Sequence, residues 1–224
     1  MFYCIPTKKG LGVEIWGTRD DLEILYDTIS KFWNDETFFN FKGYEDKNNL
    51  ISGFSYEVRK ATSGSRFTHE SSHFSSDEIP HFGFKVSWPH ILFGLAALRY
   101  NMKMVETTKW DVAIFLLLEY ELERSLENYD LEGAKKLITY LNGSINADNE
   151  YLYLFMRNVN ASFFQLKGGK RAFRKLADLM RVSVFFSEEY SELLHFLESE
   201  ANKYNCDVKD LELNDNDALY EIEW

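Results

Sequence analysis

The stretch that decides the fold class is FGFKVSWPHILFGLAALRYN, residues 82–101. Its first part, Phe82–Trp88, alternates well enough between the two faces of a strand to predict a β-strand. Pro89 follows, and proline is suited to the first turn of a helix, which we expect to span Pro89–Asn101. The apolar run Ile91–Leu98 within that helix has only eight residues, whereas a membrane-spanning helix needs about 20. The sequence therefore predicts a strand followed by a helix, and no membrane span.

The residues before this stretch begin with a predicted hairpin and a helix. Phe2–Ile5 and Val13–Trp16 are short runs rich in β-branched and aromatic residues, and a turn that contains Gly10 separates them. Thr18 is typical of a helix N-cap, because its hydroxyl can accept a backbone N–H of the first turn. The helix that follows has an apolar stripe at helical spacing, made of Leu22, Leu25, Tyr26, Ile29, Phe32 and Trp33.

The segment Asn48–Ala61 is compatible with a helix or a strand. Leu50, Phe54 and Val58 fit a period near 3.6, whereas the serines and the glycine between them lower the helix propensity. We expect a helix and keep the strand as the alternative. Residues 62–76 are rich in serine, which favours loops and short strands.

After Thr107 the chain predicts helices alone. Strands followed by helices, without an internal repeat, are typical of an α+β fold. We expect a small antiparallel sheet from the N-terminal third to half, packed with a mainly helical C-terminal half. No linker divides the chain, so we expect one domain, 1–224, with a mixed part (1–106), a helical part (107–206) and an acidic tail (207–224). The expected helices are Lys109–Asn128, Asp130–Leu141, Glu150–Leu166, Lys170–Phe186 and Ser187–Tyr204.

The composition is that of a globular protein. Of the 224 residues, 45% are hydrophobic and 27% are charged, which excludes disordered and collagen-like chains. The two cysteines, Cys4 and Cys206, lie near opposite ends and give no disulfide framework. The chain does not open with a basic region followed by an apolar stretch, so we expect no secretion signal and a cytoplasmic location.

The negative charge is concentrated at the C-terminal end. The net charge is −11, and residues 188–224 hold 12 acidic and two basic residues, which leaves 24 acidic and 23 basic residues elsewhere. Charges act over about 8–10 Å in physiological salt. A localised acidic segment therefore does not exclude nucleic-acid binding by the rest of the chain.

Three parts of the sequence resemble a known family. They are Gly12–Gly17 with Asp21–Leu22 and Leu25–Tyr26, then Tyr56–Ala61 with Gly64 and Arg66, and then Trp88–Pro89 with Leu92–Phe93. These stretches are similar to an uncharacterised bacterial family known only as a domain of unknown function, over roughly the first 125 of the 224 residues. The resemblance implies a shared α+β fold. It brings no activity, ligand or catalytic residue.

One motif points to metal chemistry. Residues 69–73 read HESSH, which satisfies the H-E-x-x-H pattern. On a helix, His69 and His73 would share one face and bind zinc, while Glu70 would activate a water molecule for hydrolysis. The surrounding serines favour a strand and turn instead, and four residues of a strand span about 13 Å. Two imidazoles that far apart cannot both bind one zinc ion at about 2 Å, so an incidental polar strand is the alternative interpretation.

The second candidate is a basic helix within residues 167–181. Arg171, Arg174, Lys175 and Arg181 are expected on its solvent side. Such a face can contact RNA, phosphate or an acidic protein, or it can simply be solvated. The expected buried stripe consists of Phe173, Leu176, Ala177 and Met180.

The tail, residues 207–224, interleaves acidic residues with aliphatic and aromatic ones and ends at Trp224. Such a segment suits docking onto a basic apolar groove, and a disordered tail needs few apolar residues. The alternatives are that the tail packs on its own body or lies across the basic helix.

Three hypotheses for the function follow. The preferred one is a non-enzymatic protein that binds a protein partner, for example an immunity-like protein whose acidic segment shields a basic nuclease toxin. Arg171, Arg174, Lys175, Arg181 and Trp224 would form its contact surface. The alternatives are a zinc-dependent hydrolase that uses His69, Glu70 and His73, and a small RNA-binding module that uses the helix 170–181.

Overall fold

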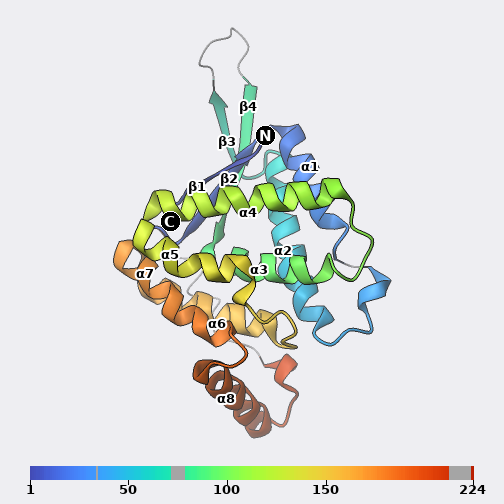
Figure 1. Ribbon diagram of the computed structural model, residues 1–224, viewed down its shortest axis with the longest axis vertical. Coiled ribbons are helices and arrows are strands. Elements are labelled where there is room, and N and C mark those ends of the chain that lie inside the picture. Colours follow the sequence, from blue (N-terminus) through green and yellow to red (C-terminus); the bar gives the residue numbers. More distant parts are fainter. Residues whose placement is uncertain (34, 72–78, 212–222) are drawn as a thin grey trace.

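The computed structural model describes residues 1–33, 35–71, 79–211 and 223–224, and its strands form one antiparallel sheet (Figure 1). β1 and β2 are the two strands of the predicted N-terminal hairpin, and β4 lies between β2 and β3. The strands come from the first 87 residues, as the sequence predicts. Their bounds are β1 (Tyr3–Pro6), β2 (Gly12–Gly17), β3 (Phe67–Ser71) and β4 (Ile79–Ser87).

Helices make up most of the remaining described chain, so the predicted α+β fold class is confirmed. α1 and α2 pack against each other and against β4, while α4 crosses β1. α8 lies at the end of the molecule opposite the β3–β4 hairpin (Figure 1). The helices are α1 (Arg19–Ser30), α2 (Tyr44–Thr62), α3 (Trp88–Asn101), α4 (Lys109–Tyr129), α5 (Leu131–Thr139), α6 (Leu152–Gln165), α7 (Lys170–Leu179) and α8 (Glu188–Tyr204).

α3 is the central helix of the fold. β4 ends at Ser87 and α3 begins at the next residue, with the Ser87 hydroxyl accepting the backbone N–H of His90 at 3.3 Å. Pro89 lies in the first turn, as expected. α3 packs against α2, α6 and β4, and a helix enclosed on most sides needs apolar residues around its whole circumference. Its buried members include Trp88 and Phe93, which have no exposed surface.

The predicted helices at the N-terminal side are confirmed. The Thr18 hydroxyl accepts the backbone N–H of Asp21, and the Asp21 carboxylate accepts the N–H of Thr18, which together form a capping box at the start of α1. The helix interpretation of residues 48–61 is also right, because Leu50, Phe54 and Val58 are buried on one face of α2.

One predicted helix ends early, and another ends near its predicted position through a π-helical turn. α7 stops at Leu179 rather than at Phe186, and a 3-10 turn follows at Met180–Ser183. Within that turn the Ser183 hydroxyl donates to the Met180 carbonyl at 2.7 Å, and serine bonds of this kind compete with helix continuation. α5 passes into a π-helical turn at Tyr140–Ser144, where Gly143 has a φ of +107° and ends the helix near the predicted position.

Candidate binding pocket between α1, α2 and α6

The described residues line an open pocket between α1, α2 and α6 with a volume of about 450 Å³. Cavities of this size are typical of sites for small organic molecules. α2 supplies most of its wall. The pocket is lined by Tyr26 and Trp33 from α1 and the turn after it, by Asn49, Ser52, Gly53, Ser55, Tyr56 and Arg59 from α2, and by Tyr153 from α6.

One of the residues that line the pocket, Trp33, carries a buried hydrogen-bond donor that the described part of the protein leaves unused. Trp33 Nε1 is buried and has no partner among the described residues. An indole nitrogen can only donate, and a buried donor without a partner costs about 1–3 kcal/mol. An acceptor on a bound molecule would satisfy this N–H group and offset that cost.

The charge of the pocket is positive. Arg59 is exposed, lies 5.5 Å from the Tyr56 ring, and has no ion-pair partner among the described residues. None of the described residues that line the pocket is acidic. The nearby carboxylate of Glu57 is already bound by Arg66, at 2.6 and 2.9 Å. Lys60 also lies over the Tyr56 ring, at 5.4 Å, so the site is suited to an anion.

A histidine lies behind the α2 wall. A side chain added at Gly53 would place its Cβ 3.5 Å from Nε2 of His90. The carbonyl of Leu50 accepts a hydrogen bond from the imidazole, whereas Nε2 is buried without a partner among the described residues. Nδ1 therefore carries the proton and Nε2 is a free acceptor. Burial lowers the pKa of His90, which keeps the ring neutral at pH 7.

The two helices that form the pocket walls are joined by Asp46. Its carboxylate, at the start of α2, accepts the backbone N–H of Tyr153 at 2.7 Å and also bonds to the N–H of Leu154. These groups belong to the first turn of α6, whose own N-cap residue, Tyr151, makes no side-chain cap. Asp46 thereby caps α6 and holds Tyr153 at the pocket. Burial raises the pKa of Asp46 to about 6.

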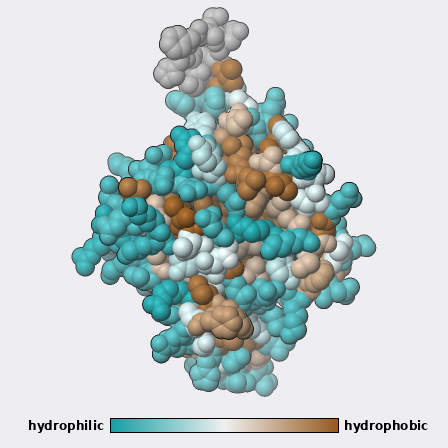
Figure 2. Space-filling view, viewed as in Figure 1, coloured by the Kyte–Doolittle hydropathy of each residue, from teal (hydrophilic) through white to brown (hydrophobic). Residues whose placement is uncertain are grey.

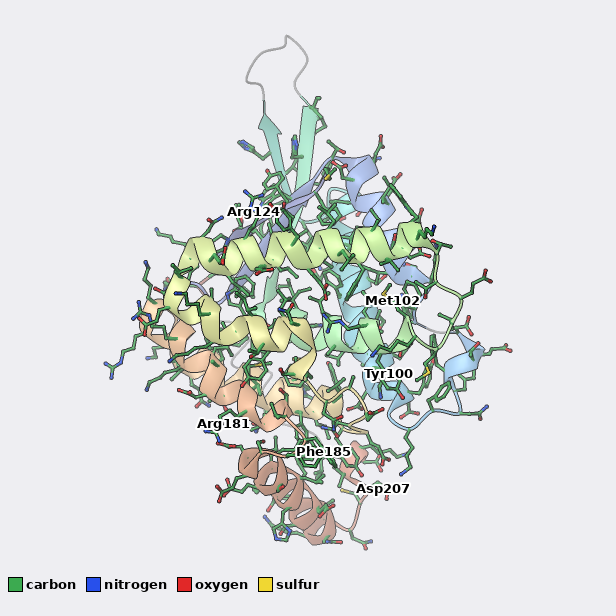
Figure 3. All side chains as sticks on the ribbon, in the orientation of Figure 1. Tyr100, Met102, Arg124, Arg181, Phe185 and Asp207 are labelled. Atoms are coloured by element: carbon green, nitrogen blue, oxygen red, sulfur yellow. The ribbon has the colours of Figure 1, made fainter. Side chains whose placement is uncertain are left out.

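The basic segment predicted from the sequence forms α7 and the 3-10 turn after it, and the structure divides its cations into two groups. Arg174 binds Asp130, the N-cap residue of α5, through two bonds of 2.7 and 2.8 Å, and also contacts Glu132. The bonds from Arg174 lower the pKa of Asp130 to about 2. Arg181 lies between α7 and α8 (Figure 3) and pairs with Glu189 at 2.9 Å.

Arg171 and Lys175 are exposed, as predicted, and have no ion-pair partner among the described residues. The expected buried stripe of α7 is confirmed, because Phe173, Leu176, Ala177 and Met180 are all buried. Two of the four cations assigned to a partner surface are therefore occupied by bonds within the chain.

The described end of the tail packs on its own body. Trp224 meets the ring of Phe164 edge-on at 6.0 Å and lies against Gly12 of β2. Glu223 pairs with Lys9 in the β1–β2 turn. α8, which carries many of the other acidic residues, lies at a different end of the molecule (Figure 1). The described carboxylates therefore do not form one acidic surface, and Trp224 is a packing residue rather than an exposed contact.

The HESSH segment begins in a strand. His69, Glu70 and Ser71 belong to β3, so the helix that the zinc motif requires is not formed there. His69 lies opposite His81 of β4 in the strand register. His73 lies outside the described residues. Within the part of the chain that the structure describes, no three His, Cys, Asp or Glu side chains are placed to hold a metal ion.

The sequence held one signal for the pocket. Ser52, Gly53 and Ser55 dilute the helix propensity of the segment that became α2, and these residues line the pocket. In the sequence alone, these residues only lower the helix propensity and do not indicate a pocket. Tyr26 and Trp33 were assigned to an apolar stripe, because spacing alone does not separate a buried residue from one that lines a cavity.

The fold and the pocket define an α+β protein whose described residues include a cationic, aromatic-walled pocket. The chain belongs to a family described as a domain of unknown function (DUF6904), whose model matches residues 2–224. The family thus covers nearly the whole chain, so the predicted limit near residue 125 is wrong. The searches of curated proteins and of solved structures gave no match.

No helix among the described residues combines the length and the hydropathy needed to cross a membrane.

Proposed function

We propose that this protein binds a small organic anion with a planar apolar body, such as an aromatic carboxylate or an aryl phosphate, in the pocket between α1, α2 and α6. The observation that carries the proposal is the buried, unpartnered N–H of Trp33, a residue that lines the pocket. The same pocket has an arginine without an ion-pair partner and no acidic lining residue among those described. The donors of Trp33 and Arg59 match the acceptors of an oxyanion.

The shape of the ligand follows from the walls. Tyr26, Trp33, Tyr56 and Tyr153 supply aromatic surface on three helical segments, and flat rings pack favourably against such surfaces. Arg59 lies beside Tyr56 near solvent, so it would meet the charged group from the solvent side, with the Trp33 N–H on the buried side. The apolar body would then occupy the interior near Ser55 and Gly53.

Titration with three probes of similar size tests the charge preference. Benzoate and phenyl phosphate carry an oxyanion, whereas benzyl alcohol is neutral. Arg59→Gln is expected to weaken binding of the two anions about tenfold, which corresponds to one charge-assisted contact of about 1.4 kcal/mol. Binding of benzyl alcohol should change little. Saturation-transfer NMR and isothermal calorimetry measure the affinities for all three probes.

Arg171→Gln is the matched control, because Arg171 is an exposed arginine on α7 without an ion-pair partner among the described residues. It should leave all three affinities unchanged. Equal loss of anion binding in both variants, or tighter binding of benzyl alcohol than of the anions, contradicts the proposal.

Gly53→Ala is expected to stabilise the protein while reducing probe binding. Glycine inside a helix costs roughly 1 kcal/mol relative to alanine, and the new methyl group would meet His90 at 3.5 Å, an ordinary contact distance. Gly53 also lines the pocket, so the added methyl group would leave less room for the probe. Thermal unfolding should shift upwards and affinity for phenyl phosphate should fall; a lower melting temperature would show that the methyl group does not fit.

Non-enzymatic binding of a protein partner, the preferred hypothesis from the sequence, is the second candidate, here with an acidic partner at the basic helix. The observation that favours it is the set of exposed cations on α7 without ion-pair partners among the described residues, namely Lys170, Arg171 and Lys175. An RNA contact, the alternative assigned to the same helix, would also show strong salt dependence. If Arg171→Glu and Lys175→Glu bind the protein partner or the RNA as tightly as the wild type does, this helix is excluded as the contact surface.

A zinc-dependent hydrolase activity stays a prediction of lower rank. It now depends on His69 in β3 and on His73, which lies outside the described residues. Structural and catalytic zinc sites use three or four protein ligands. Elemental analysis of untagged protein, with His69→Ala as the comparison, decides whether zinc is bound.

A further inference from the structure

α4 presents an apolar stripe to solvent. Figure 2 shows a hydrophobic patch over the N-terminal half of this helix. Val112, Leu116 and Tyr120 are 41%, 54% and 56% exposed. They are four residues apart, so they share one face of the helix. Side chains of this kind, repeated along one helix face, mark a surface that another helix can cover.

Charged residues of opposite sign close the two ends of this stripe. Lys109 lies seven residues before Leu116 and Glu123 lies seven residues after it, so both fall on the same face. Lys109 is exposed, Glu123 is half-buried, and neither has an ion-pair partner among the described residues. The line through Leu116 is therefore positive at Lys109, apolar in the middle and negative at Glu123. Arg124, which pairs with Glu121 and lies over the Tyr120 ring, flanks this line at the edge of the face.

The stripe on one α4 helix is complementary to the same stripe on a second α4 helix that runs in the opposite direction. In an antiparallel pair of α4 helices with Leu116 on the twofold axis, Val112 of one chain faces Tyr120 of the other, and Lys109 faces Glu123. A parallel pair would instead place Lys109 against Lys109. α4 has 21 residues and is about 30 Å long, which is sufficient for contacts over two heptads.

We propose that the protein forms a symmetric homodimer through antiparallel packing of α4 against α4 of a second copy, centred on Leu116. The contact is independent of the pocket, which lies between α1, α2 and α6. The dimer and the bound anion can therefore be tested separately.

Analytical ultracentrifugation of the full chain over a wide concentration range is the first test. The wild type should show a monomer–dimer equilibrium, and Leu116→Asp should weaken it at least about tenfold, because a carboxylate would be buried at the axis. Leu131→Asp is the matched control, since Leu131 on α5 is also 54% exposed and lies outside the stripe. A monomeric wild type, or equal effects of the two variants, overturns the proposal.

Charge exchange tests the antiparallel register. Lys109→Glu and Glu123→Lys should each weaken the dimer, because each places like charges together at both ends of the interface. The double variant restores opposite charges and should recover the wild-type affinity. Failure of the double variant to recover overturns the register.

A cysteine at the axis gives a direct readout of the same register. Under mild oxidation, Leu116→Cys in a Cys206→Ser background should form a covalent dimer, whereas Leu131→Cys in that background should not. Cys4 is buried and stays in both proteins. Thermal unfolding verifies that each variant is folded, so absence of the Leu116→Cys crosslink counts against this contact rather than against the fold.

Discussion

Asp46→Asn is expected to be more stable than the wild type at pH 7 and about equally stable at pH 4. Burial raises the pKa of the Asp46 carboxyl from 3.8 to about 6, so the native state holds its proton more strongly than the unfolded chain does. The stability that this group contributes is present below about pH 4 and is lost as the pH rises through about 6. A shift of this size corresponds to a loss on the order of 2–3 kcal/mol.

The asparagine variant isolates this effect. Its amide oxygen can still accept the backbone N–H of Tyr153, so the cap of α6 is kept while the titrating group is removed. Other groups titrate in both proteins, and the informative quantity is the difference between the two free energies of unfolding. Urea unfolding at intervals between pH 4 and pH 7 measures it. A difference that stays constant with pH would show that Asp46 ionises normally in the folded protein.

Ser52→Trp is expected to abolish binding of all three probes while leaving the fold intact. Ser52 lines the pocket and is half-buried, and its hydroxyl makes only a long 3.4 Å bond to the Asn49 carbonyl. An indole at this position would occupy much of the roughly 450 Å³ cavity. Charged and neutral probes should therefore be excluded together, unlike the selective loss expected for Arg59→Gln. Calorimetry with benzoate and benzyl alcohol measures both.

Ser191→Trp provides the control for a large side chain on a helix. Ser191 is exposed on α8, and its hydroxyl makes a similar 3.4 Å bond to the Ser187 carbonyl. It should leave binding unchanged. If Ser52→Trp still binds the probes with wild-type affinity, they occupy a site other than this pocket.

Many helices and strands of this fold could be predicted from the sequence, because residues close together in the chain determine them. The Thr18 cap, the start of α3 after Ser87 and the apolar stripe of α7 each depend on residues a few positions apart. The transition from strand at Phe82 to helix at Pro89 is likewise read from adjacent residues.

The pocket could not be predicted from the sequence, because it depends on contacts between distant segments. Trp33 and Tyr153 are separated by 120 positions yet line one cavity. The role of Arg174 was missed for the same reason. Its partner, Asp130, lies at the start of another helix, and a sequence pattern that shows a basic face does not show which of its charges are already paired.

The most direct test of the proposed function is the indole N–H resonance of Trp33 in a ¹H–¹⁵N spectrum, assigned by comparison with Trp33→Phe. The protein has five tryptophans, so the other four indole signals are internal controls. Titration with phenyl phosphate is predicted to move the Trp33 signal downfield as its unpartnered N–H gains an acceptor, with smaller changes elsewhere. A Trp33 signal that stays in place while phenyl phosphate binds would contradict the assignment of this pocket as the anion site.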